Sequence, residues 1–307
     1  MEWERVPGPV RSCCETLWAA GEAACPVGGC VRDSLLGRTP GDWDVATSAR
    51  PETVQALFAR TVPTGLRHGT VTVLLDGMSL EVTAFRREEG YSDGRRPDRV
   101  VFGVGLTEDL ARRDFTINAM ALLPDGTVAD PFGGRADLVE RVIRCVGDPE
   151  RRFREDALRM LRAVRFAAQL GFAIEEETAA ALRREAAGLE QVSGERVRVE
   201  LEKTLLSQRP ELCALPVELG MLARFGAPAR QVDLTELAVL PATPEERWRG
   251  FCQKTGLDIT AMPVERGLRR AGLAEPSPGP ALTRGGGEAR RGLRGRGELV
   301  LVQHHLH

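Results

Sequence analysis

Two aspartates stand two positions apart in the segment GDWDVAT at residues 41–47. If residues 43–47 form a strand, Asp42 and Asp44 emerge on one face of it, because side chains alternate along a strand. Carboxylates placed in this way can bind one Mg²⁺ ion or a pair of them. An isolated Asp-x-Asp is more often a turn with solvated charges. The assignment therefore depends on the residues around it.

A glycine pair and an arginine lie just upstream of these acids. Gly28 and Gly29 precede an apolar, helix-like segment at residues 30–36. Bare backbone N–H groups at a helix N-terminus can receive a triphosphate. Arg32, one turn into that segment, adds a permanent positive charge. These three residues are candidates for nucleotide binding.

A third acid lies in the segment SLEVTAF at residues 79–85. Leu80 and Val82 alternate with Glu81, as expected for a strand with one buried face. Burying an acid without a cation is costly, so Glu81 is a candidate to join the two aspartates. Three carboxylates on neighbouring strands suit two-metal phosphoryl transfer, in which the ions activate a hydroxyl and hold the triphosphate and the leaving pyrophosphate.

Several motifs follow one another between about residues 27 and 206: GGCVRDSLLGR, GDWDVATSARPE, RHGTVTV, EVTAFR, RRDFTINAMA, DPFGGRADL, RRFREDALRMLRAVRFAAQLGF and SGERVRVELEKTL. This ordered set resembles the class II CCA-adding tRNA nucleotidyltransferases and the related bacterial poly(A) polymerases. The resemblance implies Mg²⁺ as cofactor and places Arg113 at the nucleotide, on phosphate or ribose, with Asp114 and Asn118 as supports. A cap at Asp114 of a helix over residues 115–122 is the structural alternative, and both can hold.

Residues 153–172 are predicted to form a helix with a polar stripe at every third position. Cytosine and adenine each present an amino donor beside a ring-nitrogen acceptor, so an acid and an arginine suit them. Asp156 and Arg159 are therefore candidates to read the base, as the resemblance also implies, and Glu155 is placed to orient Arg159. A salt-bridged surface helix is the alternative. The stripe comprises Asp156, Arg159, Arg162 and Arg165, all predicted to bind the nucleotide.

The periodicity predicts an α+β fold: a head with a small mixed β-sheet, followed by an all-α neck and body. Helices are expected at residues 13–23, 153–170, 176–189, 194–206 and 210–225, with Gly171 as a stop signal. The predicted units are a head at 1–135, a neck at 136–206, a partial body at 207–273 and a disordered or aberrant tail at 274–307. The Pro-, Gly- and Arg-rich end suggests a truncated or frame-shifted C-terminus.

Composition narrows the class of protein. The 307 residues are 42% apolar and 28% charged, without a membrane-length apolar run or a secretion signal. Seven cysteines without a Cys-x-x-Cys pair argue against zinc or disulfides and favour a reducing, cytoplasmic compartment. The net charge of −2 does not indicate RNA binding by itself, because binding a polyanion needs a local basic surface. The arginines at 95–96, 151–165, 196 and 198 are candidates to form one.

The resemblance implies addition of CMP, CMP and AMP to the 3′ end of tRNA from CTP and ATP, with no membrane and no protein partner. It also links a loop at residues 86–103 to adding the final A, which favours a full CCA enzyme. A poly(A) polymerase and an enzyme adding only CC or only A are alternatives within the same chemistry. A catalytically impaired tRNA- or nucleotide-binding protein is the alternative from another class.

Overall fold

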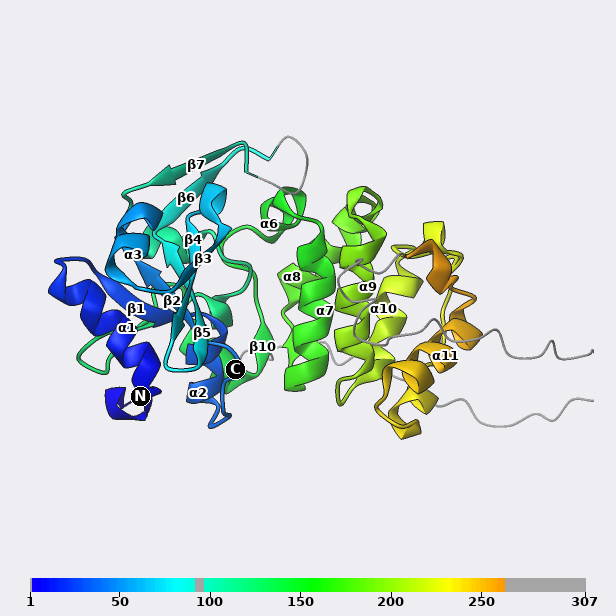
Figure 1. Ribbon diagram of the computed structural model, residues 1–307. Coiled ribbons are helices and arrows are strands. Elements are labelled where there is room, and N and C mark those ends of the chain that lie inside the picture. Colours follow the sequence, from blue (N-terminus) through cyan, green and yellow to red (C-terminus); the bar gives the residue numbers. More distant parts are fainter. Residues whose placement is uncertain (1, 92–96, 263–307) are drawn as a thin grey trace, which may run out of the picture.

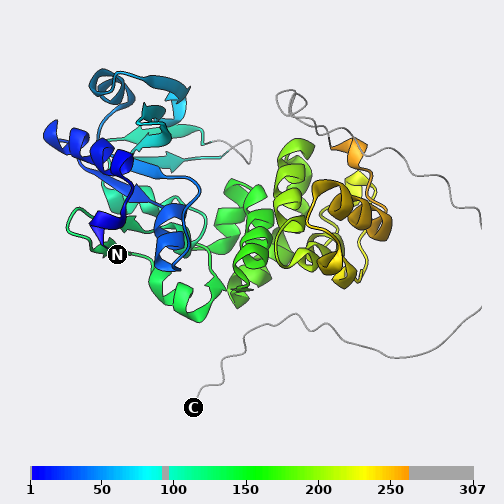
Figure 2. The ribbon, with the colours of Figure 1, turned by 60° about the horizontal axis from the view of Figure 1, so that its bottom comes forward.

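A computed structural model describes residues 2–91 and 97–262 of the chain. Figure 1 shows a lobe built on a β-sheet and, beside it, a stack of helices formed by the later part of the chain. Figure 2 shows the same two lobes after rotation. The predicted α+β class, with the sheet first and helices after it, is confirmed.

The first lobe contains a seven-stranded mixed sheet. Its strands are β1 (Ala24–Val27), β2 (Asp44–Thr47), β3 (Thr61–Gly65), β4 (Thr70–Leu75), β5 (Met78–Ala84), β8 (Ala121–Leu122) and β9 (Val128–Ala129). Their order in the sheet is β3-β4-β5-β2-β1-β8-β9. β2 and β5 pair in parallel and the other neighbours pair antiparallel. A parallel pair needs a crossover, and the chain between β2 and β5 supplies it.

Two helices pack on this sheet. α1 (Gly8–Ala19) contacts β1 and β2, and α3 (Pro51–Leu57) contacts β4 and β5. The buried residues of α1 recur with the spacing of one helical face, at Val10, Cys13, Cys14 and Leu17. The prediction of a helix at 13–23 was right in type and wrong in its bounds. The chain turns at Gly21 (φ 84°) and enters β1 at Ala24.

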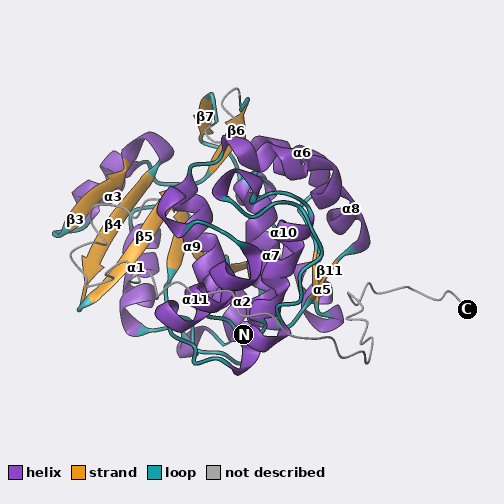
Figure 3. Cartoon of the chain, turned by 90° about the vertical axis from the view of Figure 1, so that its right-hand side faces the viewer, coloured by secondary structure: helices purple, strands orange, loops and turns teal. Residues whose placement is uncertain are grey.

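Within the segment predicted as a polar loop at residues 86–103, the described residues include two strands that form the arms of a hairpin. β6 (Arg86–Glu89) pairs antiparallel with β7 (Arg99–Phe102). Figure 3 shows this hairpin standing apart from the main sheet. Arg95 and Arg96, two of the proposed RNA contacts, lie outside the described residues.

The remaining elements carry the chain into the helical lobe. α7 packs on α9, and α6 packs on α8. Together these elements are α2 (Gly29–Leu35), α4 (Leu106–Ala111), α5 (Gly134–Glu140), β10 (Val142–Ile143), α6 (Pro149–Glu155), α7 (Leu158–Leu170), β11 (Ala173–Ile174), α8 (Glu176–Glu185), α9 (Gly194–Leu205), α10 (Ala214–Glu218) and α11 (Pro244–Thr255). Gly171 ends α7 in the left-handed conformation (φ 70°), as predicted.

The helix predicted over residues 153–172 is two helices, because the chain breaks at Asp156. That residue is extended (φ −149°, ψ 103°) and ends α6. Its Oδ1 accepts the backbone N–H of Leu158 at 3.1 Å, at the first residue of α7. Short polar side chains favour such capping over a helix interior. The helix predicted at 210–225 is similarly divided into short turns around α10.

The alternative helix at residues 115–122 is absent from the described structure. A turn of 3₁₀ helix occupies Thr116–Asn118 and the chain then enters β8. Sheet pairing decides this local structure, because Ala121 pairs with Val27 and Ala129. All seven cysteines carry free thiols. None of the helices in residues 2–91 and 97–262 combines the length and apolarity that a bilayer crossing needs. The predicted tail at 274–307 lies outside the described residues.

Candidate active site

Two of the three predicted acids, Asp44 and Glu81, lie on adjacent parallel strands; the strand predicted at 43–47 begins at Asp44, so Asp42 is outside it. Asp44 begins β2 and stands in register with Glu81 on β5. Register partners on neighbouring strands point to the same side of the sheet. Asp42 precedes β2 by two residues and is exposed. Glu81 is exposed as well, so the argument from the cost of burying it was wrong, although its predicted proximity to Asp44 is confirmed.

The surroundings of Asp44 raise the pKa of its carboxyl. Burial raises the pKa of its carboxyl, the negative charges of Glu81 and Asp42 raise it further, and the guanidinium of Arg113 lowers it. All three acids and one arginine therefore lie within electrostatic range of one another. Like charges held together in this way are stabilised by a cation placed between them.

This arrangement fits a hard divalent ion whose coordination shell is completed by substrate and water. Among residues 2–91 and 97–262, no three acidic, histidine or cysteine side chains are grouped closely enough to enclose a metal ion. Mg²⁺ rarely uses a cage made only of protein side chains; one or two carboxylates plus substrate phosphates and water suffice. Asp42 and Asp44 are the residues that can supply them.

Gly28 and Arg113 meet beside these acids. Gly28 adopts a positive φ of 79°, and a Cβ added there would lie 2.9 Å from Nη1 of Arg113. A larger residue at position 28 would be strained by the positive φ and would displace the end of the Arg113 side chain. Arg113 pairs with buried Asp109 (Nη2 to Oδ2, 3.4 Å), and its buried Nε has no hydrogen-bond partner in the described structure. The site thus holds a guanidinium with unused donor capacity.

A chain of polar contacts joins the glycine segment, Gly28 and Gly29 at the start of α2, to the helical lobe. Nη1 of Arg32 donates to Oδ1 of Asn118 at 2.6 Å, and Nδ2 of Asn118 donates to Oδ1 of Asp114 at 3.2 Å. Oδ2 of Asp114 in turn accepts from Nε of Arg162 at 2.7 Å. Residues on α2, before β8 and on α7 are thereby linked. α2 is only seven residues long, so these side chains, more than a helix dipole, supply the positive charge.

Asp114 makes the stability of this junction depend on pH. Burial alone raises the pKa of Asp114, but Arg162 and the Asn118 amide outweigh burial and lower the pKa from 3.8 to about 2. A depressed pKa stabilises the fold above the unfolded-state pKa, and that contribution is lost as pH falls through the folded value.

We expect Asp114→Asn to remove this contribution. The gap in the free energy of unfolding between the native chain and the variant should shrink by about 2 kcal/mol between about pH 5 and about pH 2. Urea unfolding midpoints measured at several pH values in that range check this. A gap that stays constant with pH would show that Arg162 and Asn118 do not lower the pKa of Asp114 in the folded chain.

The predicted base-reading residues line a cavity of about 350 Å³. Four arginines face two carboxylates there, so the cavity carries excess positive charge suited to a nucleotide. It lies where the hairpin, the segment after α4 and the start of α7 meet. Its lining residues are His68, Arg86, Glu88, Tyr91, Pro97, Arg112, Asp156, Arg159 and Arg196.

Glu155 holds Arg159 as predicted, although across the break between α6 and α7 and not on one continuous helix. Nη1 of Arg159 pairs with Oε2 of Glu155 at 2.7 Å. The same guanidinium donates to the backbone carbonyls of Arg152 and Arg112. Asp156 pairs with Arg196 (Oδ2 to Nη2, 2.8 Å). Arg159 is therefore fixed in direction, and the Asp156 carboxylate is engaged by Arg196.

Sequence reasoning missed the hairpin side of the cavity. Glu88 accepts from the Tyr91 hydroxyl at 2.5 Å and pairs with Arg86 at 2.7 Å. The alternation of Arg86 and Glu88 in RREE has strand spacing and was the available signal. Arg112 stands next to Arg113 in the motif, but only its position in the fold shows that it faces the cavity.

Other candidates lie apart from this cavity. Arg165 is buried and pairs with Glu200 (Nε to Oε2, 3.2 Å), so direct contact with a nucleotide would require that pair to open. Arg198, a proposed RNA contact, donates to the carbonyl of Met262 and lies over Trp248.

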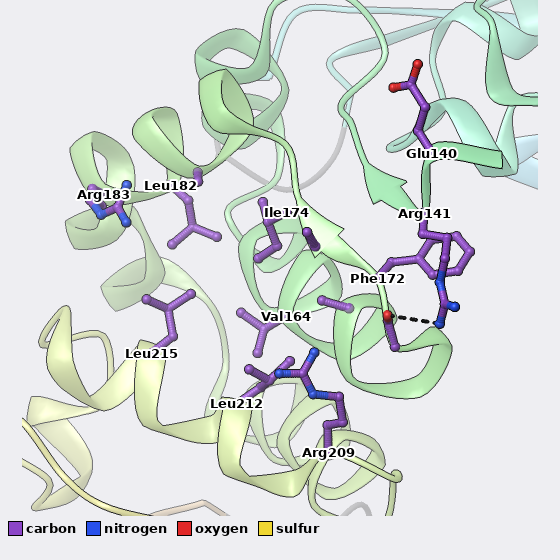
Figure 4. Close-up of a pocket in the computed structure, with 14 residues that line it drawn as sticks. Glu140, Arg141, Val164, Phe172, Ile174, Leu182, Arg183, Arg209, Leu212 and Leu215 are labelled. Carbon is purple, nitrogen blue, oxygen red and sulfur yellow. Dashed lines mark hydrogen bonds between the residues drawn. The ribbon is translucent and has the colours of Figure 1, made fainter. Parts of the chain in front are cut away.

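An apolar cavity of about 340 Å³ lies at the other end of α7 and is separate from the site (Figure 4). Val164, Leu182 and Leu215 line it, with Arg209 at its edge, and Arg141 donates to the carbonyl of Gly171. It holds no candidate catalytic residue.

Two family models match the chain. One, described as "Poly A polymerase head domain", covers residues 25–144, and the other, "Probable RNA and SrmB- binding site of polymerase A", covers residues 171–225. The first contains the glycine segment and the three acids.

Curated relatives and solved structures agree with these matches. The chain is 56% identical over 231 residues to the CCA-adding enzyme of Lactiplantibacillus plantarum, covering 74% of this chain and 56% of that enzyme. It is 48% identical over 242 residues to that of Anoxybacillus flavithermus, covering 77% and 61%. The crystal structure of the Bacillus stearothermophilus CCA-adding enzyme in complex with CTP is similar with a TM-score of 0.72 and 41% identity, covering 84% of this chain and 65% of that one. The Thermotoga maritima CCA-adding enzyme complexed with tRNA gives a TM-score of 0.60 and 29% identity, covering 73% and 54%. The chain thus spans little more than half the length of the curated relatives it matches.

Proposed function

The chain belongs to the family of class II CCA-adding enzymes and bacterial poly(A) polymerases, and from that membership we propose that it adds CMP, CMP and AMP to the 3′ end of tRNA. CTP and ATP are the substrates and pyrophosphate is the leaving group. The observation that carries the proposal is the register of Asp44 with Glu81 beside Arg113 and the glycine segment. Similar proteins solved with CTP and with tRNA support the same substrates here.

Asp42 and Asp44 would hold Mg²⁺, which supplies a lowered pKa for the attacking 3′ hydroxyl and neutralises the triphosphate. Glu81, in register with Asp44, is the third catalytic acid in this proposal. A separate general base is not required in this chemistry.

In this proposal, different side chains contact different parts of the nucleotide. Arg32 and Arg113 bind the triphosphate beside Gly28 and Gly29, and Arg162 binds the nucleotide from α7. Asp156 accepts the exocyclic amino group of cytosine or adenine, and Arg159 donates to the neighbouring ring nitrogen. Uracil and guanine present the opposite pattern on the same edge, so both would leave polar groups unpaired.

The predicted units at 1–135, 136–206 and 207–273 correspond in this proposal to a catalytic head, a nucleotide-selecting neck and part of an RNA-binding body. The segment at 86–103, which carries β6 and β7, contributes to adding the final A. A poly(A) polymerase remains the second candidate, because the head-domain match carries that name.

Product length distinguishes these activities. We expect a tRNA lacking its last three nucleotides to gain three residues with CTP and ATP and then stop. A poly(A) polymerase would continue with ATP. An enzyme that adds only CC would stop after two residues, and one that adds only A would extend only a tRNA that already ends in CC. An impaired binding protein would retain tRNA without extending it. Denaturing gels of labelled products check this. Extension should cease with a chelator and return with added Mg²⁺.

A further inference from the structure

Phe166 lies at the centre of a group of three guanidinium groups. The Cζ atoms of Arg165, Arg32 and Arg162 lie 4.3, 5.1 and 5.4 Å from the centroid of its ring. Guanidinium groups within about 6 Å of an aromatic ring are attracted by its quadrupole. One ring on α7 therefore contacts cations from both lobes.

The ring itself is held in place. Phe166 is 6% exposed and meets the fully buried Phe115 edge to face, with centroids 5.8 Å apart and planes at 81°. Phe115 directly follows Asp114, the acid that pairs with Arg162. The ring is thus anchored to the same segment that carries the polar link between the lobes.

The three guanidinium groups repel one another, because all of them lie within 5.4 Å of the same ring centroid. Burial lowers the pKa of Arg165, the charges of Arg162 and Arg32 lower it further, and Glu200 opposes them. The acids Asp33, Asp114 and Glu200 each pair with one of the three arginines. The ring adds an attraction shared by all three, so the geometry of the group depends on its electron density.

Arg32 stands far from Arg162 in sequence, yet both are proposed to contact one nucleotide. From these contacts we propose that Phe166 is a positioning residue, whose ring holds Arg32 on α2 and Arg162 on α7 in the arrangement that binds the triphosphate nucleotide. The proposal rests on the proposed function for the identity of the ligand. It assigns Phe166 no contact with substrate.

Fluorinated phenylalanines test this without changing the shape of the core. Incorporation of 4-fluoro-, 3,5-difluoro- and 3,4,5-trifluorophenylalanine at position 166 progressively weakens the ring quadrupole. We expect the dissociation constant for CTP and the KM for CTP and ATP to rise stepwise, by about tenfold at the trifluoro ring. The thermal midpoint, kcat and the preference for C and A over U should change little. Phe153, 1% exposed in the same lobe, is the matched control position.

Calorimetry with CTP alone separates the two hypotheses. Stepwise loss of CTP affinity at 166 and none at 153 supports the positioning role even if no tRNA is extended, in which case only the proposed function fails. Flat affinity across the series overturns the inference and leaves the proposed function intact. Equal losses at both positions, or losses that track the thermal midpoint, identify a packing role and also overturn it.

Discussion

We expect Asp42→Ala to abolish detectable nucleotide incorporation while leaving the chain folded. If Asp42 and Asp44 hold the divalent ion as proposed, the variant removes one of its two protein ligands, and kcat/KM should fall by about 10³-fold, equivalent to about 4 kcal/mol of transition-state stabilisation. Asp42 is exposed and outside β2, so the free energy of unfolding should change by no more than about 0.5 kcal/mol. Incorporation of labelled CTP into tRNA and thermal unfolding measure the two quantities.

Asp44→Asn should match this loss, because the amide keeps the shape of the side chain and removes its charge. Glu15→Ala is the control: it removes an exposed carboxylate on α1, in the same lobe but outside the proposed site. Substantial incorporation by Asp42→Ala at saturating Mg²⁺ would remove the two aspartates from the catalytic role.

We expect Asp156→Ala combined with Arg159→Ala to relax the choice of base. The two side chains line the same cavity, and Arg159 is directed by Glu155 and two backbone carbonyls. Losing a complementary pair of hydrogen bonds costs about 1–3 kcal/mol of discrimination, so the ratio of kcat/KM for CTP over UTP should fall by about 10- to 100-fold. Steady-state kinetics with each nucleotide measures it.

The comparison needs a variant that also removes one arginine and one carboxylate, but outside the cavity. Arg154→Ala combined with Glu150→Ala provides it, since both side chains lie on α6 and pair with each other at 3.0 Å, and Arg154 is 62% exposed. It should leave the ratio unchanged. Unaltered discrimination against UTP in the double variant would exclude Asp156 and Arg159 from reading the base.

Much of the fold was predictable because it depends on local patterns. Alternation in residues 79–85 indicated β5, and the spacing of residues 194–206 indicated α9. A glycine after residue 170 marked the end of α7. The errors arose where a non-local contact outweighed a local preference. The alternative helix over residues 115–122 is absent because Ala121 pairs with β1 and β9.

The residues of the candidate site were easier to predict from the sequence than the contacts between them. Asp42, Asp44 and Glu81 could be named from spacing, whereas the burial argument for Glu81 was wrong because its side chain is exposed. The pairing of Arg165 with Glu200, the break at Asp156 and the hairpin wall of the cavity could not be named. Each depends on segments that meet only after folding.

The sequence by itself determined the order of the motifs and the residue types that carry charge and flexibility, because alternation, helical spacing and glycine positions act within a few residues. Only the tertiary structure decided that Asp44 faces Glu81, that Gly28 makes room for Arg113, and that Phe166 gathers three arginines. These contacts join residues that are distant in the chain, and their geometry is set by strand register and helix packing, which no local pattern encodes.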